Sequence, residues 1–322
     1  MRRRTPLPPD LAQGPFSVRD ALRAGVSAGR LRDPALDRPF HGTRAPAILP
    51  PAGESRSARE QRVLLAQCAA YSSRLAPDEH FSHQTEARLW GCPLPTWFDT
   101  AEPLHVARPG RGARGAGVVG HNSSTPTLTR RYGYPVSDPA STWLALASVL
   151  LLDDLVAVGD HLILDPRVLN PRDPRPYVTV EELAARLAVY HGRGARLAHE
   201  ALPLLRQGAE SRPETLVRLL LARAGCAEPV LQAPIFDNDG RLLGYADLYW
   251  PDLKIVVEYD GQHHRTDDVA YDRDLIRIDD FLAAGNLVVR IRKYGLFRAP
   301  AGEVARVERA FRQRMAPSGP KV

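Results

Sequence analysis

The stretch VVEYDGQHHR, residues 256–265, places side chains suited to metal-dependent chemistry directly after an apolar run. Glu258 and Asp260 are carboxylates separated by one residue, and the adjacent histidines His263 and His264 follow three residues later. Carboxylate oxygens are common ligands of divalent cations, and imidazole transfers protons near neutral pH. The stretch therefore indicates a functional site where a strand ends.

The segment that leads into this stretch, residues 241–260, has the pattern of a β-hairpin with a two-residue loop in WPDL. In that register Asp247 faces Val256, and Asp247 and Glu258 are diagonal neighbours, about 7–8 Å apart between Cα atoms. Because side chains alternate, one face carries Asp247, Lys254, Val256, Glu258 and Asp260, and the opposite face forms the core. A three-residue loop would reverse these faces.

Carboxylates that converge repel one another and lose hydration, so packing alone does not favour them. A divalent cation removes this conflict, and oxygen ligands without cysteine favour Mg²⁺ or Mn²⁺ over zinc. Asp247 and Glu258 are the predicted ligands, and Glu214, on a helix that Ser211 caps, can supply another carboxylate. The alternative interpretation is a solvated sheet edge with many charges.

The C-terminal region contains eight polar residues that form a recognisable pattern when they are taken as a set. They are Glu214, Asp247, Glu258, Asp260, His264, Asp274, Arg277 and Arg290. Together they resemble the PD-(D/E)XK nuclease superfamily, most closely its Vsr-like endonuclease-domain branch, over roughly residues 211–315. The resemblance implies a domain with a mixed sheet flanked by helices. It also implies that this domain hydrolyses DNA phosphodiester bonds with Mg²⁺, in DNA repair or in defence against foreign DNA.

The resemblance also implies roles for single residues. Asp260 or His264 would position or deprotonate the attacking water. Arg277 and Arg290 are the predicted DNA contacts, with plain ion pairs as the alternative for Arg277. The motif lysine of the superfamily, which orients water and offsets charge, is replaced here by Asp260. A non-catalytic DNA-binding regulator or antitoxin with a degenerate nuclease-like domain is therefore the alternative function.

The N-terminal segment 15–46 has the pattern of a helix-turn-helix followed by a wing or hairpin. Ser17 and Asp20 form a cap for the first helix, and Gly25 ends it. Ser27 begins the second helix. The residues expected in its small core are Val18, Leu22, Val26 and Leu31.

Arg30 and Arg32 on that second helix are predicted to contact DNA. Residues 15–165 resemble the helix-turn-helix and middle regions of AbiEi-type antitoxin proteins, which implies a role in a toxin–antitoxin system. A plain helical hairpin that docks on the rest of the chain is the alternative interpretation of this segment.

The composition is that of a globular protein of 322 residues with a net charge of +6. The charge favours a DNA partner only weakly, because arginine in place of lysine also follows from a GC-rich coding sequence. The three scattered cysteines, the lack of a long apolar run and the polar start MRRRTPLPPD predict a cytoplasmic protein without membrane contact. We expect an α+β fold with four parts: residues 1–50 (helix-turn-helix), 51–176 (middle domain), 177–210 (helical connector) and 211–322 (nuclease-like domain).

Overall fold

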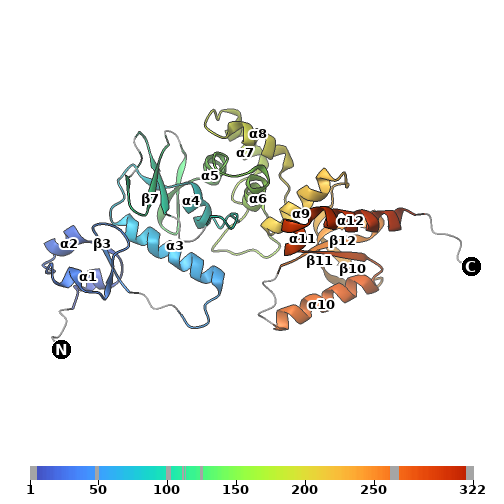
Figure 1. Ribbon diagram of the computed structural model, residues 1–322, viewed down its shortest axis with the longest axis horizontal. Helices are drawn as coiled ribbons and strands as arrows, with labels where there is room; N and C mark the ends of the chain where they lie inside the picture. The colour runs from blue at the N-terminus through green and yellow to red at the C-terminus, as the bar shows by residue number, and fades with distance from the viewer. Residues whose placement is uncertain are drawn as a thin grey trace, which may run out of the picture. The chain divides into compact units, whose positions relative to one another are not determined.

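The computed structural model describes residues 6–47, 51–98, 103–110, 112, 114–123, 126–261 and 268–316. These residues combine helices with several sheets, so the predicted α+β class is confirmed (Figure 1). The chain forms two compact units, residues 1–149 with 186–195 and residues 150–185 with 196–322. Among the described helices, none combines the length and apolar composition needed to cross a membrane.

The first unit begins with short elements around a three-stranded sheet of order β1-β3-β2. They are α1 (Pro9–Ala12), β1 (Phe16–Ser17), α2 (Val18–Arg23), the 3-10 turn η1 (Arg30–Arg32), β2 (Leu36–Asp37) and β3 (Thr43–Pro46). The hydroxyl of Ser17 accepts a hydrogen bond from the backbone N–H of Asp20 at 3.0 Å, and Gly25 has a φ of +81° after the helix. The predicted cap, the glycine stop and the β2–β3 hairpin are therefore present.

Two predictions for this segment are wrong. The second helix is a single 3-10 turn, because Pro34 keeps Asp33 in an extended conformation with a ψ of 131°. Leu22 is 49% exposed, and Ala21 packs instead with Val26 and other apolar residues of the core.

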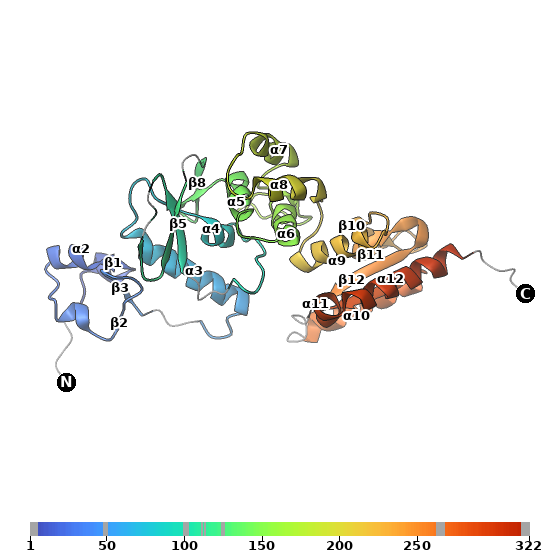
Figure 2. The same cartoon turned by 45° about the horizontal axis from the view of Figure 1, so that its top comes forward.

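The remainder of the first unit is built on a six-stranded sheet of order β6-β7-β5-β4-β9-β8. Its elements are α3 (Arg56–Ser72), β4 (His80–Phe81), α4 (His83–Leu89), β5 (Leu104–Arg108), β6 (Arg114–Gly115), β7 (Val118–Asn122), β8 (Leu128–Arg131), β9 (Tyr134–Ser137) and α5 (Pro139–Leu146). Figure 2 shows α4 beside β5, and the two elements are in contact.

Helices lead from this sheet into the second unit. They are α6 (Leu152–Ile163), α7 (Val180–Ala188), α8 (Ala195–Ala201), the 3-10 turn η2 (Leu202–Leu204) and α9 (Arg212–Arg223). The helix α6, which the sequence-based division assigns to the middle domain, packs against α9.

A four-stranded sheet of order β10-β11-β12-β13 forms the centre of the C-terminal region. Its elements are β10 (Val230–Phe236), β11 (Leu242–Trp250), the 3-10 turn η3 (Pro251–Leu253), β12 (Ile255–Asp260), α10 (Asp268–Ala283), β13 (Leu287–Arg292), α11 (Lys293–Arg298) and α12 (Pro300–Met315). β11 pairs antiparallel with both β10 and β12, and β12 and β13 are parallel. The sheet is therefore mixed.

Helices cover both faces of this sheet (Figure 1). Leu248 and Val257 pack with apolar side chains of α9 and α12, which is the face predicted to be the core. Val256 packs on the other face against Ile278 and Phe281 of α10. An apolar stripe of α10 therefore covers this second face as well.

Candidate functional site

The β11–β12 hairpin brings Asp247 and Glu258 together, in a register that differs from the predicted one. Trp250 pairs with Ile255, because η3 and Lys254 make a four-residue loop in which Lys254 has a left-handed conformation. This register continues to a position where Asp247 lies directly opposite Glu258 rather than diagonal to it. The shift is by an even number of residues, so the two carboxylates stay on one face as predicted. Lys254 itself is exposed in the loop and is not on the strand.

Both carboxylates accept hydrogen bonds from backbone N–H groups of the neighbouring strand. The backbone N–H of Asp247 donates to Oε1 of Glu258 at 3.3 Å, and the N–H of Tyr259 donates to Oδ2 of Asp247 at 2.9 Å. These bonds hold the two side chains beside each other where the regular pairing of β11 with β12 ends.

Glu214 joins this pair through a glutamine that the sequence interpretation did not single out. Ser211 caps α9 and donates its hydroxyl to Oε1 of Glu214 at 2.7 Å. The amide of Gln232 on β10 donates to Oε2 of Glu214 at 3.2 Å and to Oδ1 of Asp247 at 3.4 Å. Gln232 has a φ of +47°, which is uncommon for residues other than glycine, so the residue type gives no signal of this backbone conformation.

Arg277, a predicted DNA contact, is part of the same site. Its guanidinium donates to Oε2 of Glu258 at 2.8 Å, to the carbonyl of Tyr245 at 2.8 Å and to Oδ1 of Asp274 at 2.5 Å. Gly244 makes room for this side chain, because a Cβ there would lie 2.9 Å from Cδ of Arg277. The spacing Asp274-x-x-Arg277 thus serves to hold a cation against Glu258.

Asp260 and Arg290 extend the site as an ion-pair network. Arg290 lies 3.2 Å from Oδ2 of Asp260 and 3.4 Å from Oδ2 of Asp274, and Arg292 lies 3.5 Å from Asp260. Asp274 therefore links Arg277 to Arg290. Arg290 is therefore bound by two carboxylates.

The carboxylate end of the network keeps unbalanced negative charge. Burial raises the pKa of Asp247 well above its ordinary value, and the neighbouring Glu258 and Glu214 raise it further. Burial also raises the pKa of Glu258, against the opposing effect of Arg277. For Glu214, burial again raises the pKa, and its hydrogen bonds only partly offset this. Positive charge at Asp247 would stabilise the ionised cluster.

A divalent cation would have to be held by the carboxylate oxygens of this cluster. Among the described residues, no group of three or more His, Cys, Asp or Glu side chains is arranged to hold a metal ion. Mg²⁺, however, is commonly bound by one or two carboxylates and keeps several waters. Asp247 and Glu258, which share a face and carry unbalanced charge, fit this smaller set.

Two other predicted residues, Arg30 and Arg32, lie in the first unit. His264 lies outside the described residues, so its place beside the carboxylates stays a prediction. Arg30 is largely covered and forms an ion pair with Asp33 at 3.2 Å. Arg32 is exposed on the η1 turn, where its guanidinium is accessible to a partner.

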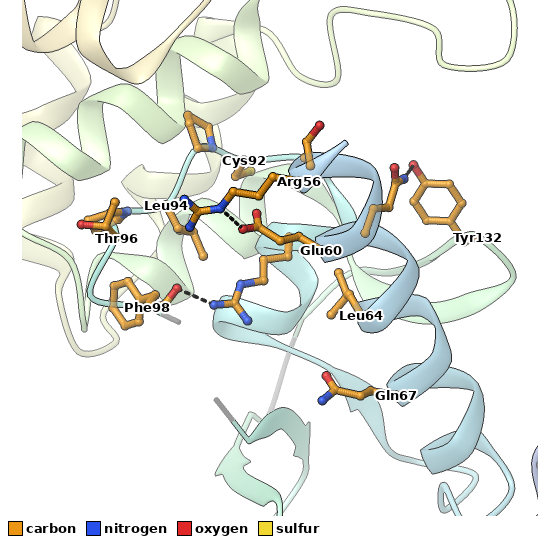
Figure 3. A pocket seen from close by; sticks show the side chains of 15 residues that line it. Arg56, Glu60, Leu64, Gln67, Cys92, Leu94, Thr96, Phe98 and Tyr132 are labelled. Carbon is orange, nitrogen blue, oxygen red and sulfur yellow. Dashed lines mark hydrogen bonds and ion pairs between the residues drawn. The ribbon is translucent and has the colours of Figure 1, made fainter. Parts of the chain in front are cut away.

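The first unit contains a pocket of about 450 Å³ between α3 and the segment 91–98 (Figure 3). Arg56 pairs with Glu60 at 2.7 Å, and Arg88 donates to the carbonyl of Phe98 at 2.6 Å. These lining groups interact with each other in the pocket wall. None of the predicted site residues lines the pocket.

Two uncharacterized proteins of Mycobacterium tuberculosis, from strains CDC 1551 / Oshkosh and H37Rv, are similar to this chain. Each is 29% identical over 237 residues, which are 72% of this chain and 81% of the relative. No family model matches the chain. No solved structure matches it either.

Proposed function

We propose that the C-terminal region hydrolyses DNA phosphodiester bonds with Mg²⁺ or Mn²⁺ bound by Asp247 and Glu258. The observation that carries this proposal is the gathering of Asp247, Glu258 and Glu214 from β11, β12 and α9 at one place. A fold that needed these residues for packing alone would not collect three carboxylates there. The mixed sheet with helices on both faces agrees with the nuclease resemblance.

The residues of the site have distinct tasks in this proposal. A bound Mg²⁺ would stabilise the charge that develops on the phosphate and lower the pKa of a water. The N–H of Tyr259 orients Asp247, and Arg277 orients Glu258. Arg277 also supplies positive charge beside Glu258, which is one task of the motif lysine that this chain lacks. His264 or Asp260 would hold or accept the proton of the water.

One observation favours the second candidate, a non-catalytic DNA-binding regulator or antitoxin. Arg277 binds Glu258 at 2.8 Å, and therefore half-neutralises the carboxylate pair without any metal ion. In that case the charge network would be structural, and DNA would bind on the surface around it. In either case we infer that the N-terminal residues 1–50 add affinity for DNA and that the protein acts in the cytoplasm.

The two candidates are separated by metal binding and cleavage in the same chain. We expect calorimetry to detect one Mg²⁺ or Mn²⁺ site in the full-length protein, and plasmid DNA to be cleaved only when the metal is present. Asp247→Asn keeps the size of the side chain but removes a charged ligand, so it should abolish both signals. Asp239→Asn, which changes an exposed carboxylate in the β10–β11 turn, is the matched control and should change neither.

Two results would contradict the nuclease. Metal binding that survives Asp247→Asn would remove the proposed ligand, and cleavage that persists in this variant would indicate a contaminating activity. DNA binding without metal binding or cleavage would favour the regulator.

A further inference from the structure

Four histidines of the first unit come together around the strands β4, β5 and β7. His80 and His121 both pair with Ala107 of β5, from opposite sides, so these positions form one row across three strands. Side chains alternate along a strand, and His105 therefore lies on the same face as Ala107. The helix α4 begins at His83 and is in contact with β5.

Three of these imidazole rings touch. Nδ1 of His105 lies 2.9 Å from Nε2 of His121, and the two ring centroids are 5.1 Å apart. The ring of His83 stacks on that of His121 with a centroid distance of 3.6 Å, and lies 6.3 Å from that of His105. All three positions are at most half-exposed, and two rings remain partly open to solvent.

The surroundings keep these rings uncharged. Burial, with the neighbouring histidines as further causes, lowers the pKa of His83 to about 3. Burial lowers the pKa of His105 to about 4, with His121 and Arg88 as further causes. A neutral imidazole has one nitrogen that carries no proton, and this is the form that ligates metals.

The cluster also contains polar atoms without a partner. His80 is 1% exposed, and neither of its ring nitrogens makes a hydrogen bond within the described part of the chain. Buried polar atoms that lack partners cost free energy, and an ion or a water at the site commonly explains them. The neighbouring chain is well held, since Glu86 accepts the backbone N–H of His83 at 2.9 Å and that of Ser137 at 3.0 Å. The position of His83 at the start of α4 is therefore built into the fold.

We propose that His105 and His121 bind a borderline divalent transition-metal ion such as Zn²⁺, with His83 as a third ligand. A tetrahedral zinc with bonds of about 2.0–2.1 Å separates two ligating nitrogens by roughly 3.3 Å and their ring centroids by about 5 Å. The pair His105–His121 is already close to both values. The proton shared between the two nitrogens moves to the other nitrogen of its ring when both bind the ion.

His83 must turn out of its stack to complete the site, because three rings do not converge in the described arrangement. Its ring faces that of His121 at an interplanar angle of 14°, so the required motion is a rotation about its side-chain bonds. This site belongs to the first unit and shares no residue with the carboxylate cluster of the second. It takes imidazole ligands, which favour zinc, copper, cobalt and nickel over Mg²⁺.

The test uses the full-length chain without a histidine tag, titrated with Zn²⁺ by calorimetry and with Co²⁺ by visible absorption. We expect one Zn²⁺ site, and a visible Co²⁺ band typical of a low-coordinate centre. His105→Ala and His121→Ala should each lower the Zn²⁺ affinity by at least about tenfold, a scale seen even for residues that only support a ligand. His199→Ala, an exposed histidine of α8, should leave the affinity unchanged.

Further measurements distinguish Zn²⁺ binding at the histidines from binding at the carboxylates, and loss of a ligand from unfolding of a variant. Asp247→Asn should leave Zn²⁺ binding intact, so failure of the nuclease proposal would not affect this one. In the unmutated protein, Zn²⁺ should protect His83 and His121 from acylation by diethylpyrocarbonate but not His199. Zn²⁺ affinity that is equal in the double variant His105→Ala/His121→Ala and in the wild type would overturn the proposal, as would acylation of His121 that Zn²⁺ does not slow.

Discussion

At the scale of single residues, the site is defined by a charge conflict that the fold only partly resolves. Asp247 lies beside Glu258 and is linked through Gln232 to Glu214. Arg277 forms an ion pair with Glu258 of this group and not with Asp247. Of the two carboxylates that lie side by side, Asp247 is therefore the one without an arginine ion pair in the described structure, so an added positive charge there stabilises the pair.

This conflict predicts how the metal-free protein responds to pH. The raised pKa of Asp247 means that the folded state binds a proton there more readily than the unfolded chain does. The stabilising contribution is full below the unfolded pKa of about 4 and is lost as the pH rises through the higher folded pKa. Asparagine is uncharged at every pH, so the variant avoids the cost of a buried negative charge at this position. We therefore expect Asp247→Asn to have a higher unfolding free energy than the wild type near pH 7 with a chelator present.

Urea unfolding at several pH values measures this difference directly. The advantage of Asp247→Asn should shrink as the pH falls toward about 4, where Asp247 is protonated in both states. Asp239→Asn, in the exposed turn, should follow the wild type at every pH. A constant difference between Asp247→Asn and the wild type would show that lost hydrogen bonds, and not charge, set the effect.

At the scale of elements, α9 is fixed by acidic side chains of α6. Arg218 and Asp160 form an ion pair at 3.1 Å in which both side chains are at most 2% exposed. The hydroxyl of Thr215 and the backbone N–H of Arg206 also donate to Asp160. Since α9 carries Glu214 at its start, these contacts determine where that carboxylate lies.

This buried pair predicts a large and non-additive loss of stability. Asp160→Ala leaves the buried guanidinium of Arg218 with only the partly exposed carboxylate of Glu228, at 3.4 Å, and loss of a buried ion-pair partner costs about 3–5 kcal/mol in comparable cases. The double variant Asp160→Leu/Arg218→Met replaces both charges by apolar groups and should lose much less. Denaturant unfolding of the wild type, of Asp160→Leu and Arg218→Met as single variants, and of the double variant measures this. A double variant that is as unstable as the sum of these single variants would contradict it.

At the scale of the whole molecule, the chain has two compact units that carry different kinds of functional side chains. The first contains the imidazole cluster and the N-terminal elements, and the second contains the carboxylates and their arginines. The net charge of +6 divides into +9 for the first unit and −3 for the second, so a general attraction to polyanions comes from the first unit. Of the four arginines predicted to contact DNA, Arg32 is the one exposed on a turn, whereas Arg30, Arg277 and Arg290 are engaged by carboxylates.

DNA affinity should therefore depend on Arg32 in a way that salt reveals. If Arg32 contacts a phosphate, Arg32→Ala should weaken binding and reduce the slope of log affinity against log salt by about 0.9. Arg196→Ala removes an exposed arginine from α8 and is the matched control. Fluorescence anisotropy with duplex DNA at several salt concentrations gives both slopes. Equal slopes for Arg32→Ala and the wild type would assign the N-terminal elements to protein contacts instead.

The sequence by itself determined the features that depend on neighbours along the chain. The caps at Ser17 and Ser211, the glycine stop after α2 and the shared face of Asp247 and Glu258 were all predictable. Capping bonds join residues three positions apart, and the alternation of side chains follows from strand geometry alone. An even error in loop length left that alternation intact.

Only the tertiary structure decided which distant groups meet. The cover of α10 over Val256 and Glu258 and the pairing of Arg277 with Glu258 depend on how helices pack on the sheet. The contact of His105 with His121 depends on the parallel register of β5 with β7. Such contacts join segments far apart in sequence, so their identity is set by the packing of the whole unit and leaves no local pattern in the chain.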